Sequence, residues 1–447
     1  MGNNQPHHLA VRFDSTSLDS VIRAACSTYH IPGVATWTSK NGQVIWRQCY
    51  GYANLEDSIP VADTTLFMLA SISKTVTATA IMQLWERGVF GLDDDINNYL
   101  PFNVRNPNYP DSIITFRMLM THTSSINDNM RVYDSLYVWG GDSPIPLGSF
   151  LEDYLVPGGV YYDSAANYRW WAPGRAFNYC NVAVGLLGYL VQVIADSFPV
   201  YCQDSIFGPL SMNETSWFLA GLDTNQIAVP YHWTGSYYQP YQHYGFPTYP
   251  DGQLRTSILQ LARHLTAFMQ YGMIDSVRIL DSTTVELMRT IQYQITPNWM
   301  TGLIWMYWNP STRWLWFHDG DDYGVSTVAA FCPAESSAVI VLTNGESWPG
   351  TQLIMNALFD YAQTPGIVED KSSSRNIRAS IPTIVHGVLN LQSEIYNLKA
   401  EIKLLDITGR KVADLKAGAN DIRHLAPGVY FIRSKNNNQV TKIIVTK

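Results

Sequence analysis

The first 370 residues of this 447-residue chain contain only two lysines, Lys40 and Lys74. The same segment carries 16 Lys and Arg residues against 32 Asp and Glu residues, whereas residues 371–447 carry 13 against 5. The net charges are therefore −16 for the larger part and +8 for the smaller part. An acidic body argues against nucleic acid as a partner, because phosphates require a basic surface. It also disfavours anionic substrates.

The chain also lacks the patterns that mark metal sites, disulfide frameworks and membrane spans. Its five cysteines include no Cys-x-x-Cys pair and its ten histidines show no ligand spacing, so we expect no catalytic metal and no cofactor. Whether the cysteines form one or two disulfides stays open. No run of about eighteen apolar residues occurs, so we expect no membrane span. The first eight residues show no signal-peptide pattern.

One of the two lysines completes a Ser71-x-x-Lys74 tetrad at the start of a helix-like run, residues 70–85. Apolar residues recur there at helical spacing, which predicts one buried stripe. Ser71 and Lys74 would share a face of the first turn, at the positive end of the helix. A lysine amine can take the proton of a neighbouring hydroxyl and so activate it as a nucleophile. The alternative is a Ser71 that caps the helix beside a solvated Lys74.

Hydrophobic patterns predict an α+β fold for the larger part. We expect strands from both ends to form one antiparallel sheet, with helices packed around it and a helical insertion between them. The strands are expected at 33–39, 43–50, 313–318, 324–332 and 336–343, and flanking helices at 16–29 and 351–362. Asn41-Gly42 would form a tight turn between the first two strands. A polar break at 369–375 coincides with the change in charge. These features predict a domain at 1–368, a linker at 369–380 and a small β-sandwich at 381–447.

Two later motifs supply residue types that a serine nucleophile needs. Tyr179-x-Asn181 precedes a helix expected at 182–195, and His318-x-Gly320 ends a strand. Beside a lysine ammonium, a phenol can lose its proton below its usual pKa of about 10 and act as a base. The Asn181 amide can position neighbouring groups. Gly320 would let a substrate backbone approach the strand closely.

In this order, the three motifs resemble those of the penicillin-recognising serine hydrolases, which include class C β-lactamases, DD-peptidases, D-aminopeptidases and related carboxylesterases. The resemblance covers about residues 15–363 and extends to four flanking stretches, at 31–34, 51–53, 119–124 and 251–257. It implies a β-lactamase/transpeptidase-like antiparallel sheet flanked by helices, with a helical subdomain.

The resemblance also implies a role for each motif residue. Ser71 would be the nucleophile that forms an acyl-enzyme. Lys74 and Tyr179 would transfer protons, with the identity of the acylation base left open. The backbone N–H groups of Ser71 and Asp321 would form the oxyanion hole. His122 is a tempting third histidine, but in the resembling family it belongs to a structural turn. The other substrate-binding positions would be Asn181, His318, Asp319 and Gly320.

The third motif departs from the family pattern, in which Lys-Thr-Gly engages a substrate carboxylate. Here it is His318-Asp319-Gly320. A mostly neutral imidazole removes an attraction for a carboxylate. Asp319 adds a repulsion of up to about 4 kcal/mol, for charges about 4 Å apart at an effective dielectric near 20. We therefore expect a hydrolase for esters or amides of neutral or amine-bearing small molecules or short peptides. The alternatives are a β-lactamase or DD-carboxypeptidase, and a penicillin-binding-like sensor without turnover.

Aromatic residues are dense between 231 and 249, where eight positions are Tyr, Trp or Phe. Such a segment can form the wall of a binding cleft, since aromatic faces enrich such clefts. It can also be a long loop that packs its own rings, which is the interpretation we favour.

The basic C-terminal part resembles the sorting domain of type IX secretion cargo in Bacteroidetes-like bacteria. The resemblance rests on an Asp-x-x-Gly-Arg-x-Val element at 406–412 and on Pro-Gly-Val-Tyr-Phe at 427–431. It implies interaction with secretion machinery and a secreted or cell-surface location, with a leader already removed. The alternatives are an accessory docking domain and, for the whole chain, a carbohydrate-binding surface protein. The oligomeric state stays open.

Overall fold

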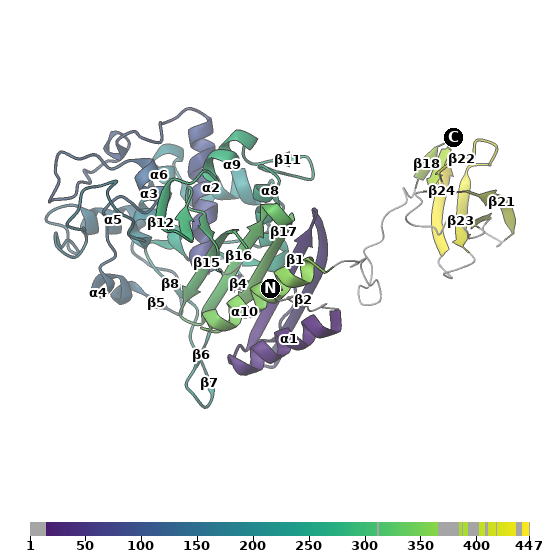
Figure 1. Cartoon of the computed structure of the whole chain (residues 1–447), viewed down its shortest axis with the longest axis horizontal. Coiled ribbons are helices and arrows are strands. Elements are labelled where there is room, and N and C mark those ends of the chain that lie inside the picture. The colour runs from purple at the N-terminus through teal and green to yellow at the C-terminus, as the bar shows by residue number, and fades with distance from the viewer. Residues whose placement is uncertain are drawn as a thin grey trace, which may run out of the picture. The chain divides into compact units, whose positions relative to one another are not determined.

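The computed structural model describes residues 15–310, 313–364, 384–386, 388–391, 402–406, 410–416, 418–434 and 440–446. The chain forms two compact units, 1–368 and 369–447 (Figure 1). The linker predicted at 369–380 lies outside the described residues.

A nine-stranded antiparallel sheet forms the centre of the larger unit. As predicted, strands from the two ends of the unit pair directly, in a register that runs from Val34 opposite Thr343 to Lys40 opposite Ser337. The tight turn expected at Asn41-Gly42 is present, with positive φ at both residues. In spatial order the strands are β12 (Tyr293–Thr296), β13 (Trp299–Thr301), β14 (Met306–Trp308), β15 (Leu315–Asp322), β16 (Val325–Cys332), β17 (Ser337–Thr343), β1 (Gly33–Lys40), β2 (Gln43–Asn54) and β3 (Ile59–Pro60).

Helices cover both faces of this sheet (Figure 1). Helices α1 (Ser15–Thr28) and α10 (Trp348–Ala362) pack on one face, against alternate residues of β17 such as Val339 and Val341. The other face carries Ile340 and Leu342 and packs against α2 (Ser73–Glu86) and α8 (Ile258–Met269). Because both faces are buried, β17 is an almost continuous apolar run.

Helix α2 is buried on all sides, whereas the sequence predicted a single buried stripe. Every residue from Ser73 to Leu84 is buried, including three threonines on what looked like a polar face. Their hydroxyl groups donate to backbone carbonyl oxygens: Thr75 to Ile72 at 2.7 Å, Thr77 to Pro250 at 2.6 Å and Thr79 to Thr75 at 2.9 Å. Burial is therefore possible on all sides, since no hydroxyl is left unsatisfied.

The remaining elements lie between β4 and β12 and form the predicted helical part. Helix α6, which begins at Asn181, packs on α2 and includes the helix expected at 182–195. Among the described residues, no single helix is long and apolar enough to cross a membrane; α6 and the segment 198–207 meet that test only as a pair bent by 86°. The other helices are α3 (Phe116–Met120), α4 (Met130–Tyr133), α5 (Leu147–Leu155), α6 (Asn181–Ala195), α7 (Phe198–Cys202) and α9 (Ser282–Met288). Four two-stranded pairs complete the unit: β4 (Leu66–Met68) with β9 (Arg255–Ser257), β5 (Val138–Trp139) with β8 (Tyr244–Gly245), β6 (Tyr231–Trp233) with β7 (Tyr238–Pro240), and β10 (Met273–Ile274) with β11 (Val277–Arg278).

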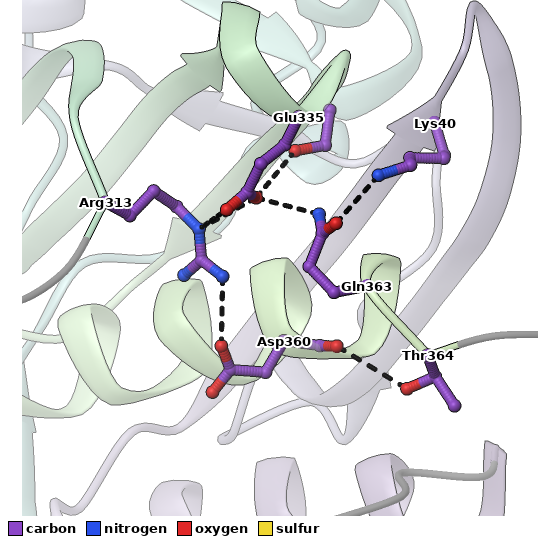
Figure 2. A network of polar contacts seen from close by, with 7 residues as sticks. Lys40, Arg313, Glu335, Asp360, Gln363 and Thr364 are labelled. Atoms are coloured by element: carbon purple, nitrogen blue, oxygen red, sulfur yellow. Dashed lines mark hydrogen bonds and ion pairs between the residues drawn. The ribbon is translucent and has the colours of Figure 1, made fainter. Parts of the chain in front are cut away.

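A polar network fastens α10 to the end of the sheet (Figure 2). Arg313 donates from Nε to both carboxylate oxygens of Glu335 at 2.8 Å and from Nη2 to Asp360 at 3.1 Å. Gln363 donates to Glu335 at 2.7 Å and accepts from Lys40 Nζ at 2.9 Å. One of the two lysines of the acidic body is thus a peripheral structural contact.

The described residues of the smaller unit form two β-sheets, an arrangement compatible with a small β-sandwich. Its core includes Leu404, Ile432 and Ile443. The five-stranded sheet has the order β18 (Ile384–His386), β24 (Val440–Thr446), β23 (Gly428–Ser434), β20 (Ile402–Leu405) and β21 (Lys411–Leu415), and the second sheet pairs β19 (Val388–Leu391) with β22 (Gly418–Asp421).

Candidate active site

Ser71 lies in a short 3-10 turn, η1 (Ala70–Ile72), that leads directly into α2. The preceding residue, Ala70, has φ +47°, a left-handed conformation that costs a non-glycine residue about 1–3 kcal/mol. Ser71 thus lies at the N-terminal end of α2, where the helix dipole favours negative charge.

The Lys74 side chain is fully buried one turn further along, with 0% of its surface exposed. Its ammonium group donates to three acceptors: Ser71 Oγ at 2.8 Å, Asn181 Oδ1 at 2.7 Å and the backbone oxygen of Asp251 at 2.7 Å. These three bonds use all the donors that an ammonium has. Lys74 therefore belongs to the site and not to the solvated surface.

The charge of Lys74 follows from its neighbours. Burial lowers the pKa of Lys74, but the interaction with Tyr179 and the negative charges of Asp251 and Asp128 outweigh it and leave the pKa raised. For Tyr179 the outcome differs from the prediction. Desolvation raises the pKa of Tyr179 although 36% of the residue's surface is exposed, and the Lys74 ammonium and Ser71 offset only part of this. The resting site thus holds an ammonium and a neutral phenol.

Two histidines flank the Tyr179 ring, and the Lys74 ammonium lies 5.1 Å from its centre. The centre of the His122 ring is 4.4 Å from that of Tyr179, and the centre of the His318 ring is 6.4 Å away. His122 accepts at Nδ1 from the Cys180 amide, 3.2 Å away. Burial, reinforced by Lys74, lowers the pKa of both imidazoles, to about 3 for His318. Both are therefore neutral at physiological pH.

His318 presents an acceptor and no positive charge. Its Nδ1 lies 2.7 Å from the backbone oxygen of Asp319, which can only accept, so the proton of this neutral ring is assigned to Nδ1. Nε2 is then a lone-pair acceptor, and it is buried without a partner. This third-motif side chain cannot attract a carboxylate as an ammonium would.

Gly320 makes a close contact within the protein in addition to its predicted role. A Cβ atom at this position would overlap the carbonyl oxygen of Leu69 and the hydroxyl of Thr327, and would lie 3.1 Å from the Cβ of Ala70. The backbone that precedes Ser71 therefore requires a glycine here. Gly320 seats η1 on β15 and places Ser71 beside Asp321.

An open cavity of about 420 Å³ lies in front of Ser71. Five of its lining residues are carboxylic acids, and among the described residues that line it none is Lys, Arg or His. Burial raises the pKa of Asp251 to about 7 and that of Asp322 to about 6. The lining residues are Ala70, Ser71, Met130, Tyr133, Asp134, Tyr137, Asn181, Asp251, Gly252, Asp321, Asp322, Tyr323 and Glu346.

The predicted site residues divide into two groups. Ser71, Asn181 and Asp321 line the cavity, whereas the others lie behind or beside it: Lys74, Tyr179, His318, Asp319 and Gly320. Asp319 acts on Lys74 and Tyr179 through its charge. The residues that sequence reasoning missed are mostly acids and tyrosines of the cavity wall. Asp251 belongs to a stretch that carried the family resemblance, but nothing in the sequence signalled that it would lie against Lys74.

The aromatic segment 231–249 mostly packs on itself and on adjacent parts of the chain, which is the interpretation favoured from the sequence. Tyr231, Tyr244, Phe246 and Tyr249 are buried, and none of the segment's residues is among those that line the cavity. Tyr244 does support the cavity wall, since its ring centre lies 5.4 Å from that of Tyr137.

The described residues contain no group of three or more His, Cys, Asp or Glu side chains that could hold a metal ion. All five cysteines lie within them and are free.

A buried Ser-x-x-Lys pair, a neighbouring tyrosine and the flanked antiparallel sheet define the chain as a serine hydrolase of the β-lactamase-like type. Residues 18–360 match the Beta-lactamase family, and the chain belongs to this family. Residues 382–446 match the Secretion system C-terminal sorting domain. Both resemblances predicted from the motifs are confirmed.

Known relatives carry several names. Penicillin-binding protein 4* of Bacillus subtilis strain 168 is 23% identical over 359 residues, 78% of this chain and 71% of that protein. Protein flp of Staphylococcus aureus strain MRSA252 is 29% identical over 220 residues, 49% of this chain and 41% of that protein. The chain thus spans about two fifths of the length of the latter relative.

Solved structures show the same fold. The octameric penicillin-binding protein homologue from Pyrococcus abyssi has a TM-score of 0.66 and 23% identity, covering 97% of this chain and 90% of that one. EstCE1, a hydrolase with promiscuous acyltransferase activity, has a TM-score of 0.62 and 19% identity, covering 78% and 99%. The class C β-lactamase from Rhodobacter sphaeroides has a TM-score of 0.59 and 20% identity, covering 78% and 98%.

Proposed function

We propose that the chain hydrolyses esters or amides of neutral or amine-bearing substrates through an acyl-enzyme on Ser71. The observation that carries this proposal is the contact of 2.8 Å between Ser71 Oγ and a fully buried Lys74, beside Tyr179. Lys74 is buried and donates one of its three hydrogen bonds to a half-buried serine at a cavity. A structural contact alone does not readily explain this arrangement.

Acylation begins when the Lys74–Tyr179 pair has lost one proton, and either group can hold the one that remains. Ser71 Oγ attacks the substrate carbonyl carbon and its proton passes to the pair. The oxyanion is held by the backbone N–H groups of Ser71 and Asp321. The pair then protonates the leaving alcohol or amine, and the C–O or C–N bond breaks. Water repeats the sequence on the acyl-enzyme and releases the acid.

The cavity wall supports the substrate class. Asp134, Asp321 and Glu346 place carboxylates around the space in front of Ser71, and His318 behind it is neutral. A substrate carboxylate would meet only like charge there, whereas an amine would find partners. The acidic wall thus extends the expectation first based on Asp319.

We also propose that the C-terminal sorting domain directs the enzyme through type IX secretion to the outside or the surface of the cell, where the substrates would be small molecules or short peptides.

The first test is labelling of the full chain with a fluorophosphonate, followed by turnover of three substrates. We expect labelling of the wild type and of the control Ser20→Ala, whose hydroxyl lies on α1 on the far face of the sheet, and none of Ser71→Ala. Labelled Ser71→Ala would refute the nucleophile. The substrates are a p-nitrophenyl ester, a D-amino-acid anilide with a free amine and a chromogenic cephalosporin. Fast cephalosporin cleavage without ester or anilide cleavage would favour a β-lactamase, and labelling without any turnover would indicate a sensor.

A further inference from the structure

The segment that contains Asp251 is fastened to the first two turns of α2 at three points. Thr77 donates to the Pro250 carbonyl oxygen at 2.6 Å, Lys74 donates to that of Asp251 at 2.7 Å, and the Leu254 amide donates to Ser73 Oγ at 3.1 Å. The backbone of Asp251 is therefore held against Lys74, and its carboxyl group lies at the cavity with only 1% of the residue exposed.

The Asp251 carboxylate interacts with two hydroxyl groups, those of Thr248 and Tyr133. Tyr133 donates its hydroxyl at 3.2 Å to one oxygen and at 3.4 Å to the other, which is a long, shared bond. By contrast, the Asp128 carboxylate accepts from the Asn181 amide at 2.8 Å, the Val182 amide at 3.0 Å and the Cys180 thiol at 3.1 Å. The Asp128 carboxylate thus caps α6, whereas the negative charge of Asp251 acts on Lys74.

Several other titratable groups surround this pair, and Lys74 is the one cation among these described residues. They are His122 and Asp128 after α3, Tyr133 of α4, Tyr137 before β5, Tyr179 and Cys180 before α6, and His318, Asp319 and Asp322 of β15. A buried ammonium needs a compensating negative charge, because the low-dielectric interior otherwise favours its neutral form.

We propose that the Asp251 carboxylate is the counter-ion of Lys74, a positioning residue that keeps the lysine an ammonium in the resting site and so sets the pH at which the Lys74–Tyr179 pair becomes active. This inference rests on the proposed function of Ser71. Burial holds the pKa of Asp251 near 7, so the carboxylate is charged on the alkaline side, where the pair must lose its proton. Its negative charge opposes that loss.

The test is the isosteric variant Asp251→Asn in the full chain, with kcat/KM for the substrate turned over measured from pH 5 to pH 10. We expect the acid limb to move to lower pH by about one unit, because an opposite charge close to a lysine has been removed. Tyr133→Phe removes a hydrogen bond to the Asp251 carboxylate and so disfavours its charged form. It should move the acid limb in the same direction by less. Asp111→Asn, an exposed acid away from the cavity, controls for net charge and should leave the limb in place.

A second readout does not depend on turnover. The chain has ten lysines, so 13C NMR of ε-labelled lysine can follow Lys74, assigned by its loss in Lys74→Met. We expect the Lys74 midpoint to fall in Asp251→Asn. An unchanged midpoint, or a folded variant inactive at every pH, would overturn the inference, since the second result would make Asp251 an obligatory acid or base. Fluorophosphonate labelling at pH 9 reports Ser71 separately, so its absence in the wild type refutes the proposed function and leaves the lysine titration interpretable.

Discussion

Gly320→Ala puts a methyl group at the point where β15 crosses the backbone that carries Ser71. The added carbon would overlap the Leu69 carbonyl oxygen and the Thr327 hydroxyl, which itself donates to Leu69 at 2.8 Å. Neither can move freely, because Ala70 is already held at φ +47° and the Leu69 amide donates to Leu254 at 2.8 Å. Relief of the overlap requires a shift of η1 on the order of 1 Å.

Displacement of a nucleophile by about 1 Å can reduce catalysis by about 10²-fold, whereas overpacking of this kind destabilises by about 1–3 kcal/mol. We therefore expect Gly320→Ala to remain folded at 25 °C and to lose about 10²-fold in kcat, with a smaller change in KM. Steady-state kinetics and thermal unfolding by circular dichroism measure the two effects. The matched control is Gly141→Ala, since a Cβ there meets nothing within 4 Å and φ is not positive. Wild-type kcat in Gly320→Ala would refute the seating role of Gly320.

Two predictions concern stability. Burial raises the pKa of the Asp322 carboxyl group from 3.8 to about 6. Between these two pH values the folded chain holds a proton that the unfolded chain has lost. This group's contribution to stability is full below about pH 4 and is lost as the pH rises through 6. Asp322→Asn should therefore raise the unfolding temperature, relative to wild type, more at pH 8 than at pH 4, and an equal change at both would contradict this. Glu335→Gln leaves the Arg313 guanidinium, 14% exposed, without its main partner and should lower the free energy of unfolding by about 1–2 kcal/mol. Asp360, the second partner of Arg313, is 52% exposed, so Asp360→Asn should lower the free energy of unfolding by less. Urea titration measures both changes.

Local patterns were sufficient to predict the elements whose burial repeats along the chain. The β-branched run of β17 and the Asn41-Gly42 turn needed no knowledge of distant neighbours. The polar face expected on α2 was wrong for a physical reason. Threonines satisfy their hydroxyls on nearby carbonyls, and one acceptor, the Pro250 oxygen, is 173 residues away. Sequence periodicity does not contain such a contact.

The same limit applies to the site. Local spacing was sufficient to place Ser71 and Lys74 on one face of a helical turn, whereas Tyr179 and Asn181 were assigned to the same site from the family resemblance. The seating role of Gly320 and the position of Asp251 depend on how β15 and η6 (Tyr249–Asp251) meet the start of α2, and only the packed fold defines this. The direction of the Tyr179 pKa was missed because burial outweighs the charge of Lys74.

The three bonds of Lys74 bear on how the site treats its substrate. With Ser71, Asn181 and Asp251 as acceptors, the ammonium has no donor left for a ligand. The third motif, which could have supplied a second cation, contributes the neutral His318 instead. In the proposed function, a substrate would contact the carboxylates of the cavity, while the positive charge of Lys74 acts on Ser71 and Tyr179. Under the proposed function, the exposed acids Asp134, Asp321 and Glu346 would select the substrate, whereas Asp251 would link selection to activation, because it lines the cavity and also lies against Lys74.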